Sequence, residues 1–416
     1  MRELHSNWKE VKLGDIVDIT MGQSPKSQFY NKINKGMPFL QGSSTFGHLY
    51  PSFEIYSSDI KKIAVNGSIL MSVRAPVGDL NMANTDICIG RGLCSINGKN
   101  KSLNRYIFYL LNYYKSKIVN IQTGTVFGAI SKDNILNFKV SIPQSEKEQK
   151  YIASILSSFD DKIELNNKTN KILEEMAQTI FKEWFINFNF PNEDGKPYKK
   201  SGGEMIDSEL GKIPKGWKIG TIGDYAKLKS GFAFKNSWWQ NDGIPVIKIQ
   251  NISSGNLNLE QCSFVSEDKY NIAENFRVNG GDLLITLTGS LGKFTIVPKL
   301  DKDALVNQRV GKFFLGEEPV KKLPFLYGIL NELKDLIVSL ANGSVQQNIS
   351  PNDVENVKII FPNDKILNKY NNLMQDIFYK IIFNQKENKK LSNIRDSLLP
   401  KLMTPKGRRA DGKIRV

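Results

Sequence analysis

The sequence predicts an α+β fold with two duplicated mixed α/β domains, separated by two long helices that form an intramolecular antiparallel coiled coil. Three observations predict it. A pattern of glycines and apolar residues occurs twice, each copy alternates short apolar runs with turn signals, and each copy ends in a long four-three repeat of apolar residues. A chain of 416 residues has room for two or three domains, each with its own core.

The duplication is visible in motifs that recur in the same order along the chain. The first copy opens with Trp8, Leu13-Gly14-Asp15 and Gly22, and the second opens with Trp217, Ile222-Gly223-Asp224 and Gly231. Later, Thr123-Gly124-Thr125-Val126 and Ile130-Ser131 recur as Asn342-Gly343-Ser344-Val345 and Ile349-Ser350. A repeat of roughly 210 residues is far longer than the roughly 20–50 residues of a solenoid unit, so it indicates two whole domains. Two similar sites on one chain imply a partner that also has two parts.

The expected domain order follows changes in composition along the chain. It comprises a first globular domain (1–144), a first long helix (145–187), a polar Pro/Gly linker (188–216), a second globular domain (217–362), a second long helix (363–404) and a basic tail (405–416). In the globular domains, the apolar runs 69–73 and 283–287 follow Asn-Gly turn signals and are expected as strands. Segments 102–118 and 322–340 carry helical spacing.

Each long helix carries apolar residues alternately four and three apart, which is the pattern of a coiled-coil seam. In the first helix the seam is Ile152, Leu156, Phe159, Ile163, Asn166, Asn170, Leu173, Ala177, Ile180 and Trp184. In the second it is Tyr370, Met374, Ile377, Ile381, Asn384, Asn388, Leu391, Arg395, Leu398 and Leu402. The simplest partner of each helix is the other.

Two asparagines interrupt each seam near its centre and are expected to fix its register, because an unpaired buried amide is costly. Antiparallel pairing sets Asn166 beside Asn388 and Asn170 beside Asn384. Parallel pairing also aligns asparagine with asparagine, so the connectivity of the chain is what favours the antiparallel arrangement. The alternative is that these four side chains face solvent.

The charge balance points to a polyanionic partner. The net charge is +15 and the isoelectric point is near 9.4, and basic side chains on phosphates release counterions. Together with the duplication this favours double-stranded DNA, whereas a merely lysine-rich surface is the alternative. With two histidines and three scattered cysteines (Cys88, Cys94, Cys262), no metal site is expected. Without an apolar run of about 20 residues or a signal peptide, the expected location is the cytoplasm and not a membrane.

These features together resemble the DNA-specificity subunit of type I restriction–modification systems. The resemblance lies in Glu209 to Trp217 opening the second copy, Trp8 to Asp15 opening the first, Gly343 to Ser350 continuing to Pro362, and the long helix that follows. It covers nearly the whole chain, and the order, spacing and duplication of the motifs are more specific than any one of them. The first copy departs from the pattern because it lacks the full Gly-Lys-Ile-Pro-Lys-Gly-Trp opening of the second.

The resemblance implies a division of labour among subunits. The two globular domains would be target-recognition domains, each reading one half of a bipartite asymmetric DNA site, with the helices as spacer. The partners would be two adenine methyltransferase subunits and ATP-dependent restriction subunits. The chain itself is expected to be non-catalytic, because GxxxxGK[ST], HExxH, GxSxG and the adenine-methyltransferase motif are absent from its sequence. AdoMet, ATP and Mg are therefore expected on the partner subunits and no cofactor on this chain.

Polar loop residues at matching places in the two copies are the candidate DNA contacts. Arg suits guanine, Asn and Gln suit adenine, and Ser, Thr and Lys suit phosphates. The candidates are Gln41, Ser43, Ser44, Arg74, Arg91, Thr125 and Lys132 in the first copy, and Lys248, Gln250, Asn251, Thr288, Gln308, Arg309, Ser344 and Gln346 in the second. Each could equally be an ordinary surface or turn residue. Loops 41–47 and 248–254 differ more than their frames, which suggests two different half-sites.

Two other functions remain as alternatives to DNA recognition. One is a coiled-coil scaffold that binds only proteins, and the other is a stand-alone nucleic-acid-modifying enzyme that uses carboxylates such as Asp282 or Asp224. The enzyme is disfavoured because the acidic residues are not clustered and Asp282 has no acidic counterpart at Ser68. Trp238 and Trp239 could stack on bases, but packing in the core is the simpler expectation.

Overall fold

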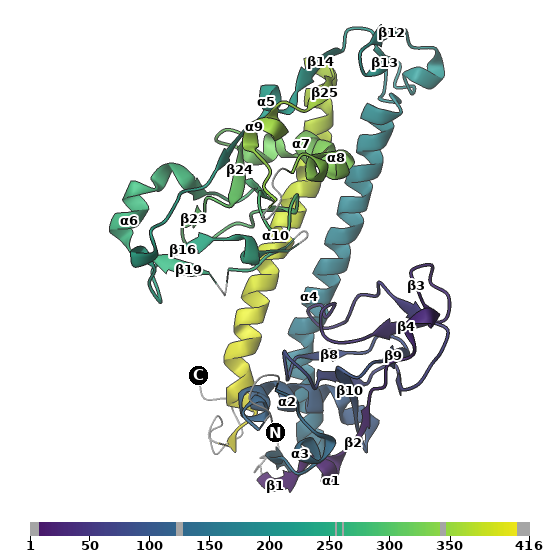
Figure 1. The fold of residues 1–416 in the computed structure, drawn as a ribbon, viewed down its shortest axis with the longest axis vertical. Helices are drawn as coiled ribbons and strands as arrows, with labels where there is room; N and C mark the ends of the chain where they lie inside the picture. The colour runs from purple at the N-terminus through teal and green to yellow at the C-terminus, as the bar shows by residue number, and fades with distance from the viewer. Residues whose placement is uncertain (1–7, 122–127, 254–255, 260–261, 342–346, 406–416) are drawn as a thin grey trace, which may run out of the picture. The chain divides into compact units, whose positions relative to one another are not determined.

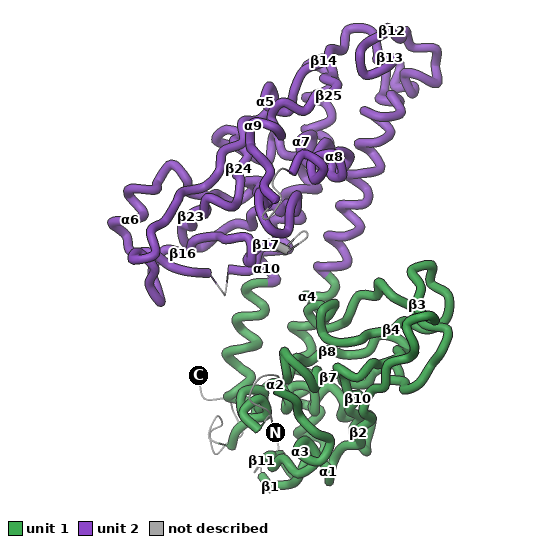
Figure 2. The backbone as a smooth tube through the Cα atoms, in the orientation of Figure 1, with its two compact units in different colours: residues 1–165, 389–416 green, residues 166–388 purple. Residues whose placement is uncertain are grey.

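The computed structural model describes residues 8–121, 128–253, 256–259, 262–341 and 347–405 (Figure 1). The chain divides into two compact units, each of which includes part of both long helices (Figure 2). Unit 1 comprises Met1–Leu165 and Lys389–Val416, and unit 2 comprises Asn166–Asn388.

The globular part of unit 1 is built on three sheets. An antiparallel sheet has the order β2-β10-β7-β8 (Val17–Met21, Leu93–Gly98, Ile69–Ser72, Leu80–Met82). A mixed sheet has the order β3-β5-β4-β9-β6 (Tyr30–Asn31, Tyr56–Ser57, Met37–Leu40, Ile87–Ile89, Ile63–Ala64), with β4 and β9 parallel. Strand β1 (Trp8–Lys12) pairs with β11 (Lys139–Pro143). The apolar run expected as a strand at 69–73 is therefore β7, at the centre of a sheet.

Helices cover these sheets and close the core of unit 1. Helix α2 (Asn104–Val119) buries Tyr106, Tyr109 and Leu110 against the antiparallel sheet, while α1 (Leu13–Ile16) and α3 (Lys132–Leu136) are short. Two 3₁₀ turns occupy Ser27–Phe29 (η1) and Lys101–Leu103 (η2). The helical spacing of 102–118 correctly predicted α2, because one face of that helix is continuously apolar.

Unit 2 repeats this arrangement, with one strand fewer in its mixed sheet and an additional pair of short strands. Its antiparallel sheet has the order β15-β24-β21-β22 (Lys227–Ser230, Val310–Phe314, Leu283–Thr286, Phe294–Ile296). Its mixed sheet has the order β19-β16-β23-β20 (Ser263–Val265, Ile244–Ile247, Ala304–Val306, Arg277–Val278), again with a parallel pair, β16 and β23. Strand β14 (Lys218–Thr221) pairs with β25 (Lys358–Phe361), as β1 does with β11, and β17 (Ile252–Ser253) pairs with β18 (Asn256–Leu257).

The helices of unit 2 are shorter and more numerous among its described residues. They are α5 (Ile222–Tyr225), α6 (Glu267–Ile272), α7 (Leu323–Glu332), α8 (Lys334–Ser339) and α9 (Pro351–Glu355), with 3₁₀ turns at Asn236–Trp238 (η5), Ile249–Asn251 (η6), Glu274–Phe276 (η7) and Pro319–Lys321 (η8). The segment 322–340, whose spacing predicted helix, contains two helices, α7 and α8. Helix α7 approaches α4 so closely that a Cβ on Gly328 would lie 2.1 Å from the Phe181 ring.

The segment expected as a polar linker, 188–216, is a folded connector. It contains a 3₁₀ turn at Lys199–Ser201 (η4) and a hairpin of β12 (Met205–Ser208) with β13 (Gly211–Pro214). Phe190 stacks between Tyr198 and Trp217, with ring centroids 4.6 and 4.9 Å away. The polar and Pro/Gly composition of the segment does not indicate these aromatic contacts, because they join residues that are not neighbours in the sequence.

The long helices are α4 (Glu146–Phe181), which ends in a π-helical turn over Lys182–Ile186 (η3), and α10 (Asp364–Leu402). In unit 2, Asn388 accepts a hydrogen bond from the Asn166 amide at 2.8 Å, and Asn170 accepts one from the Asn384 amide at 2.8 Å. Because the residue number rises on one helix as it falls on the other, the helices are antiparallel, as predicted. The role of these asparagines in fixing the register stays a prediction.

In unit 1 the same two helices pack against the globular core. Leu156 and Ile152 of α4 belong to one apolar cluster with Leu402 and Met403 at the end of α10. All the expected seam positions of both helices are buried or half-buried, so the four-three repeat was a correct guide to the paired faces. Within the described part of the chain, no helix is both long enough and apolar enough to cross a membrane.

Candidate nucleic-acid interface

Three loops of unit 1 come together where strands of its two larger sheets, the antiparallel and the mixed sheet, end. They are residues 41–44 after β4, residues 73–79 between β7 and β8, and residues 90–92 between β9 and β10, and we call this set interface 1. Backbone hydrogen bonds join them: Gly90 N–H donates to Leu40 O at 2.8 Å, and Gly92 N–H to Gln41 O at 3.1 Å. Val73 N–H in turn donates to Gly92 O at 2.8 Å, so the three loops form one rigid surface.

The predicted contacts of the first copy are mostly on interface 1, but they are not equally available. The Arg74 and Arg91 side chains are exposed and make no hydrogen bond or ion pair with another described residue. Ser43 instead donates to the Asp79 carboxylate at 3.1 Å, and Lys115 pairs with the same carboxylate at 2.9 Å. The remaining candidates are Gln41 and Ser44 on the first loop and Lys132 at the start of α3, all exposed.

Unit 2 builds the same surface from residues 248–251, 287–293 and 307–309, which we call interface 2. Asn307 N–H donates to Ile247 O at 2.9 Å, as Gly90 does to Leu40 in unit 1. Leu287 N–H donates to Arg309 O at 3.0 Å, as Val73 does to Gly92. The two interfaces thus share a backbone frame, while the side chains carried on it differ.

The predicted contacts of the second copy divide into available and occupied groups. Gln250, Gln308 and Arg309 have exposed side chains without a hydrogen bond or ion pair to the rest of the described chain. Lys248 is occupied, because its ammonium donates to Ser263 Oγ at 2.7 Å and lies 3.6 Å from the centre of the Trp239 ring. Burial is the main reason that the pKa of Lys248 is lowered.

Two other candidates of the second copy lie below the surface. Asn251 is 2% exposed, and its Oδ1 accepts from the Lys248 backbone N–H at 2.9 Å. Thr288 is half-buried and bridges to Asn348, just as Arg74 bridges to Ala129 in unit 1. Thr125, Ser344 and Gln346 lie outside the described residues. Burial thus makes Asn251 a structural residue of the loop.

Trp238, in the 3₁₀ turn η5, and the adjacent Trp239 are half-buried and belong to an aromatic cluster of unit 2. Phe232 stacks on Trp238 with ring centroids 5.9 Å apart, and Phe234 tilts against Trp239 at 5.4 Å. Packing explains these rings, in line with the simpler expectation from the sequence.

A buried charge cluster that was not expected from the sequence links the globular part of unit 1 to its helices. Asp160 of α4 is 1% exposed and accepts hydrogen bonds from Tyr109 Oη at 2.5 Å and Arg395 of α10 at 2.5 Å. The ring of His48, in the loop after interface 1, lies 2.9 Å from the same carboxylate. Burial acts to raise the pKa of Asp160, but the hydrogen bond from His48 and the charge of Arg395 outweigh it and hold that pKa below its ordinary value.

A second feature that was not expected from the sequence is Ser24, which contacts the first and third loops of interface 1. Its hydroxyl donates to Gln41 Oε1 at 2.8 Å and accepts from the Arg91 backbone N–H at 3.1 Å. Counting from the matched glycines Gly22 and Gly231, the counterpart of Ser24 in the second copy is Ala233. A comparison of the two copies at this offset could have drawn attention to the hydroxyl.

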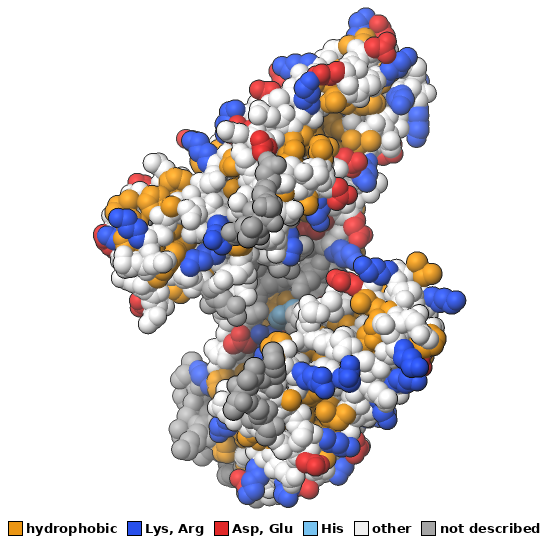
Figure 3. All heavy atoms as spheres, in the orientation of Figure 1, with side chains coloured by type: hydrophobic (Ala, Val, Ile, Leu, Met, Phe, Trp, Pro, Cys, Tyr) orange, Lys and Arg blue, Asp and Glu red, His pale blue; other side chains and the backbone are white. Residues whose placement is uncertain are grey.

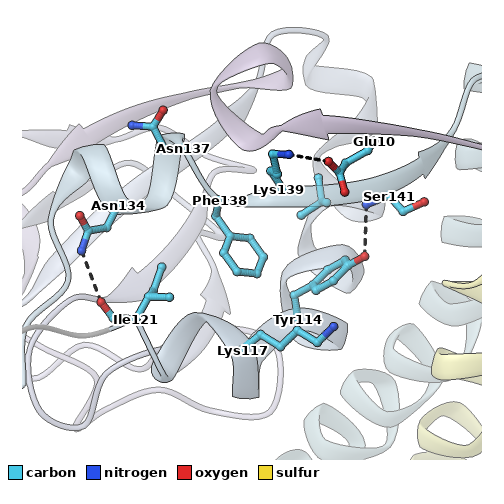
Figure 4. Close-up of a pocket in the computed structure, with 10 residues that line it drawn as sticks. Glu10, Tyr114, Lys117, Ile121, Asn134, Asn137, Phe138, Lys139 and Ser141 are labelled. Carbon is cyan, nitrogen blue, oxygen red and sulfur yellow. Dashed lines mark hydrogen bonds and ion pairs between the residues drawn. The ribbon is translucent and has the colours of Figure 1, made fainter.

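A hollow in unit 1 lies away from these loops, between α2, α3 and the β1–β11 pair (Figure 4). Lys139 on its rim pairs with Glu10 at 2.8 Å, and the Tyr114 hydroxyl accepts from the Ser141 N–H at 3.2 Å. Since most of its polar groups bond to one another, it is a weak candidate for a ligand site.

The described residues contain no group of three or more His, Cys, Asp or Glu side chains arranged to hold a metal ion. The three cysteines are buried and free, and burial raises the pKa of the Cys94 thiol to about 12. Basic side chains are instead the prominent charged groups, and they occur in several separate groups over the face of unit 1 seen in Figure 3. The surface chemistry therefore fits a polyanion.

Comparison with known proteins decides the family. The model of the type I restriction modification DNA specificity domain matches residues 5–175 and again residues 214–393. The chain belongs to this family. The two matches also confirm that the chain is a duplication, as the recurring motifs predicted.

Relatives along the full length agree with this assignment. The chain is 29% identical to the type I restriction enzyme MjaIX specificity subunit of Methanocaldococcus jannaschii, over 96% of this chain and 94% of that protein. It is 26% identical to the MjaVIII specificity subunit of the same organism, over 100% of this chain and 96% of that one. Its fold is similar to the crystal structure of a type I S subunit from M. genitalium, with a TM-score of 0.56, 16% identity and 96% of each chain covered.

Membership of the specificity family confirms the function predicted from the sequence. The chain is a DNA-recognition component of a type I restriction–modification system and not an enzyme in its own right.

Proposed function

We propose that interface 1 and interface 2 each read one half of a bipartite, asymmetric site on double-stranded DNA, with the paired helices as spacer. The observation that carries this proposal is the common backbone frame of the two interfaces, on which different side chains are exposed. A fixed frame with variable side chains is what two related but distinct half-sites require, because base edges are distinguished by donor and acceptor patterns.

The predicted contacts differ in how exposed their side chains are and in whether those side chains already have partners. Arg74 and Arg91 on interface 1, and Gln308 and Arg309 on interface 2, are exposed on rigid loops and have no described partner to compete with DNA. Lys248, by contrast, is already occupied, so in this proposal it shapes interface 2 and does not contact phosphate.

The proposal places the chemistry on other subunits. Two adenine methyltransferase subunits would modify the site, and ATP-dependent restriction subunits would cleave DNA, with AdoMet, ATP and Mg bound by those partners. The names of the relatives as subunits of type I restriction enzymes support this assembly. The sequence supports it as well, because it contains no GxxxxGK[ST], HExxH, GxSxG or adenine-methyltransferase motif.

Base-resolution mapping of adenine methylation tests the proposal. Cells that express the chain with its methyltransferase are compared with cells that express the methyltransferase alone. We expect a gapped, asymmetric two-part motif only when the chain is present. Unchanged methylation, with a methyltransferase that is active alongside another specificity chain, would overturn the DNA-reading role and favour a protein-binding scaffold.

Salt dependence of binding provides a second, independent test. The purified complex is titrated with duplex DNA carrying the mapped motif at increasing salt. Contacts to about 6–10 phosphates would lower the affinity about 10³–10⁵-fold between 50 and 200 mM salt. A scaffold that binds only proteins would show no such slope with DNA.

A further inference from the structure

The turn between the last two strands of the recognition frame presents different groups in the two units. In interface 1 it is Gly90-Arg91-Gly92, between β9 and β10, and in interface 2 it is Asn307-Gln308-Arg309, between β23 and β24. The turns are equivalent, because each starts with an N–H that donates to the end of the neighbouring parallel strand. The first turn therefore projects one side chain where the second projects three.

The two glycines of the first turn are required by the close approach of Gln41. A Cβ on Gly92 would lie 2.4 Å from the Gln41 backbone oxygen, and a Cβ on Gly90 would lie 2.6 Å from Gln41 Oε1. A side chain at Gly92 would therefore require the loop backbone to move, whereas a side chain at Gly90 would displace the Gln41 amide. Gln41 and Arg91 are thus held side by side on interface 1.

Ser24 then orients the Gln41 amide. The Ser24 hydroxyl donates to Gln41 Oε1 at 2.8 Å, so the oxygen end of the amide is turned toward the loop. The same hydroxyl accepts from the Arg91 N–H, which holds Ser24 in the orientation needed for that bond. The Gln41 Nε2 group has no partner among the described residues, and it can only donate.

We propose that Ser24 is a positioning residue that turns the Gln41 amide NH2 group outward, so that Gln41 selects a base with a major-groove acceptor and rejects cytosine, beside a guanine read by Arg91. The inference rests on the proposed function of interface 1. Glutamine normally reads adenine with both ends of its amide, the oxygen accepting from the adenine amino group. With its oxygen end turned toward Ser24, Gln41 presents its NH2 group to the DNA. That group can donate to O6 or N7 of guanine, O4 of thymine or N7 of adenine, whereas cytosine presents only an amino donor at its major-groove edge.

Unit 2 lacks this arrangement and therefore serves as an internal comparison. Ala233 stands where Ser24 does and has no hydroxyl, and Lys248 stands where Gln41 does, with its ammonium occupied by Ser263 and Trp239. Gln308 has both ends of its amide free of described partners, so it remains able to read adenine in the usual way. The two half-sites are then expected to differ in chemistry.

The test is adenine-methylation mapping with four variants of the full chain in complex with its methyltransferase. The wild-type motif first supplies both half-sites. In Ser24→Ala the amide is free to rotate, and we expect the discrimination against cytosine at one position to fall about tenfold. Ser24→Thr retains the hydroxyl and should restore the wild-type preference. Arg91→Ala should relax a guanine of the same half-site by about tenfold or more.

The fourth variant, Gln41→Glu, distinguishes a change in hydrogen-bonding chemistry from a general disturbance of the loop. A carboxylate accepts and does not donate, so it should favour cytosine at the position that Ser24→Ala relaxes. In all four variants the other half-site should be unchanged. An unaltered motif in Ser24→Ala and Gln41→Glu would overturn the inference, as would relaxation in the half-site read by unit 2. A wild-type chain that yields no gapped motif would instead refute the proposed function itself.

Discussion

Replacing Asp160 with alanine tests whether the buried charge cluster secures the fold of unit 1. The Asp160 carboxylate is 1% exposed and is bound by Tyr109, His48 and Arg395. Its removal leaves the Arg395 guanidinium, whose side chain is only 20% exposed, without its main counter-charge. Breaking a buried pair from one side costs about 3–5 kcal/mol, so we expect unit 1 to lose stability by about that amount.

The neighbouring residue on the same helix is a matched control. Asp161 pairs with Arg105 at 2.8 Å, but its side chain is 57% exposed. Exposed pairs contribute about 0–1 kcal/mol because water screens them, so Asp161→Ala should be nearly neutral. The two variants remove the same group from adjacent positions and differ in burial.

Hydrogen exchange measured peptide by peptide is the suitable assay, because the chain has two units and a single global transition is not assumed. Protection over α2 should fall on the order of 10²–10³-fold in Asp160→Ala, and protection of unit 2 peptides should not change. An equal, small effect of the two variants would refute the reasoning, as would a loss confined to unit 2.

The same cluster has a defined pH dependence. The folded-state pKa of Asp160 lies below its ordinary value, so its contribution is fully present above the ordinary carboxyl pKa. That contribution is lost as the pH falls through the folded-state pKa. The difference in stability between the wild type and Asp160→Ala should therefore shrink only in acid, below about pH 4.

Three further predictions concern single sites in the cores. Gly328→Ala, normally favourable inside a helix, should destabilise unit 2 by about 1–3 kcal/mol in urea unfolding, because the new methyl would meet Phe181; a stabilised variant would contradict the close approach. Asn384→Leu should cost about 1–3 kcal/mol by stranding the Asn170 amide, and adding Asn170→Leu should recover it; equal losses in single and double variants would argue against the pair. Cys94 should react with thiol reagents only after unfolding, since burial raises its pKa to about 12; rapid labelling of the native chain at neutral pH would contradict this.

Regular patterns in the sequence predicted the large features of the fold. The four-three repeat fixed which faces of the long helices pair, because the period of a helix places those positions on one side. The recurrence of Trp8 and Gly22 as Trp217 and Gly231 indicated a second copy of the same domain. Helical spacing over 322–340 did not show the break between α7 and α8, and the polar composition of 188–216 did not show its hairpin or aromatic contacts. Local composition does not indicate where a helix breaks or which aromatic residues meet.

The sequence by itself determined the duplication, the long paired helices, the family and the set of polar loops where recognition was sought. Only the tertiary structure decided which of those polar residues are free. Lys248 looks like a phosphate contact in the sequence, yet it is held by Ser263 and Trp239. Ser24 looks unremarkable there, yet it orients Gln41 and holds the turn of Arg91. The physical reason is that periodicity is a property of neighbouring residues, whereas hydrogen bonds and burial join residues that the chain brings together only when it folds.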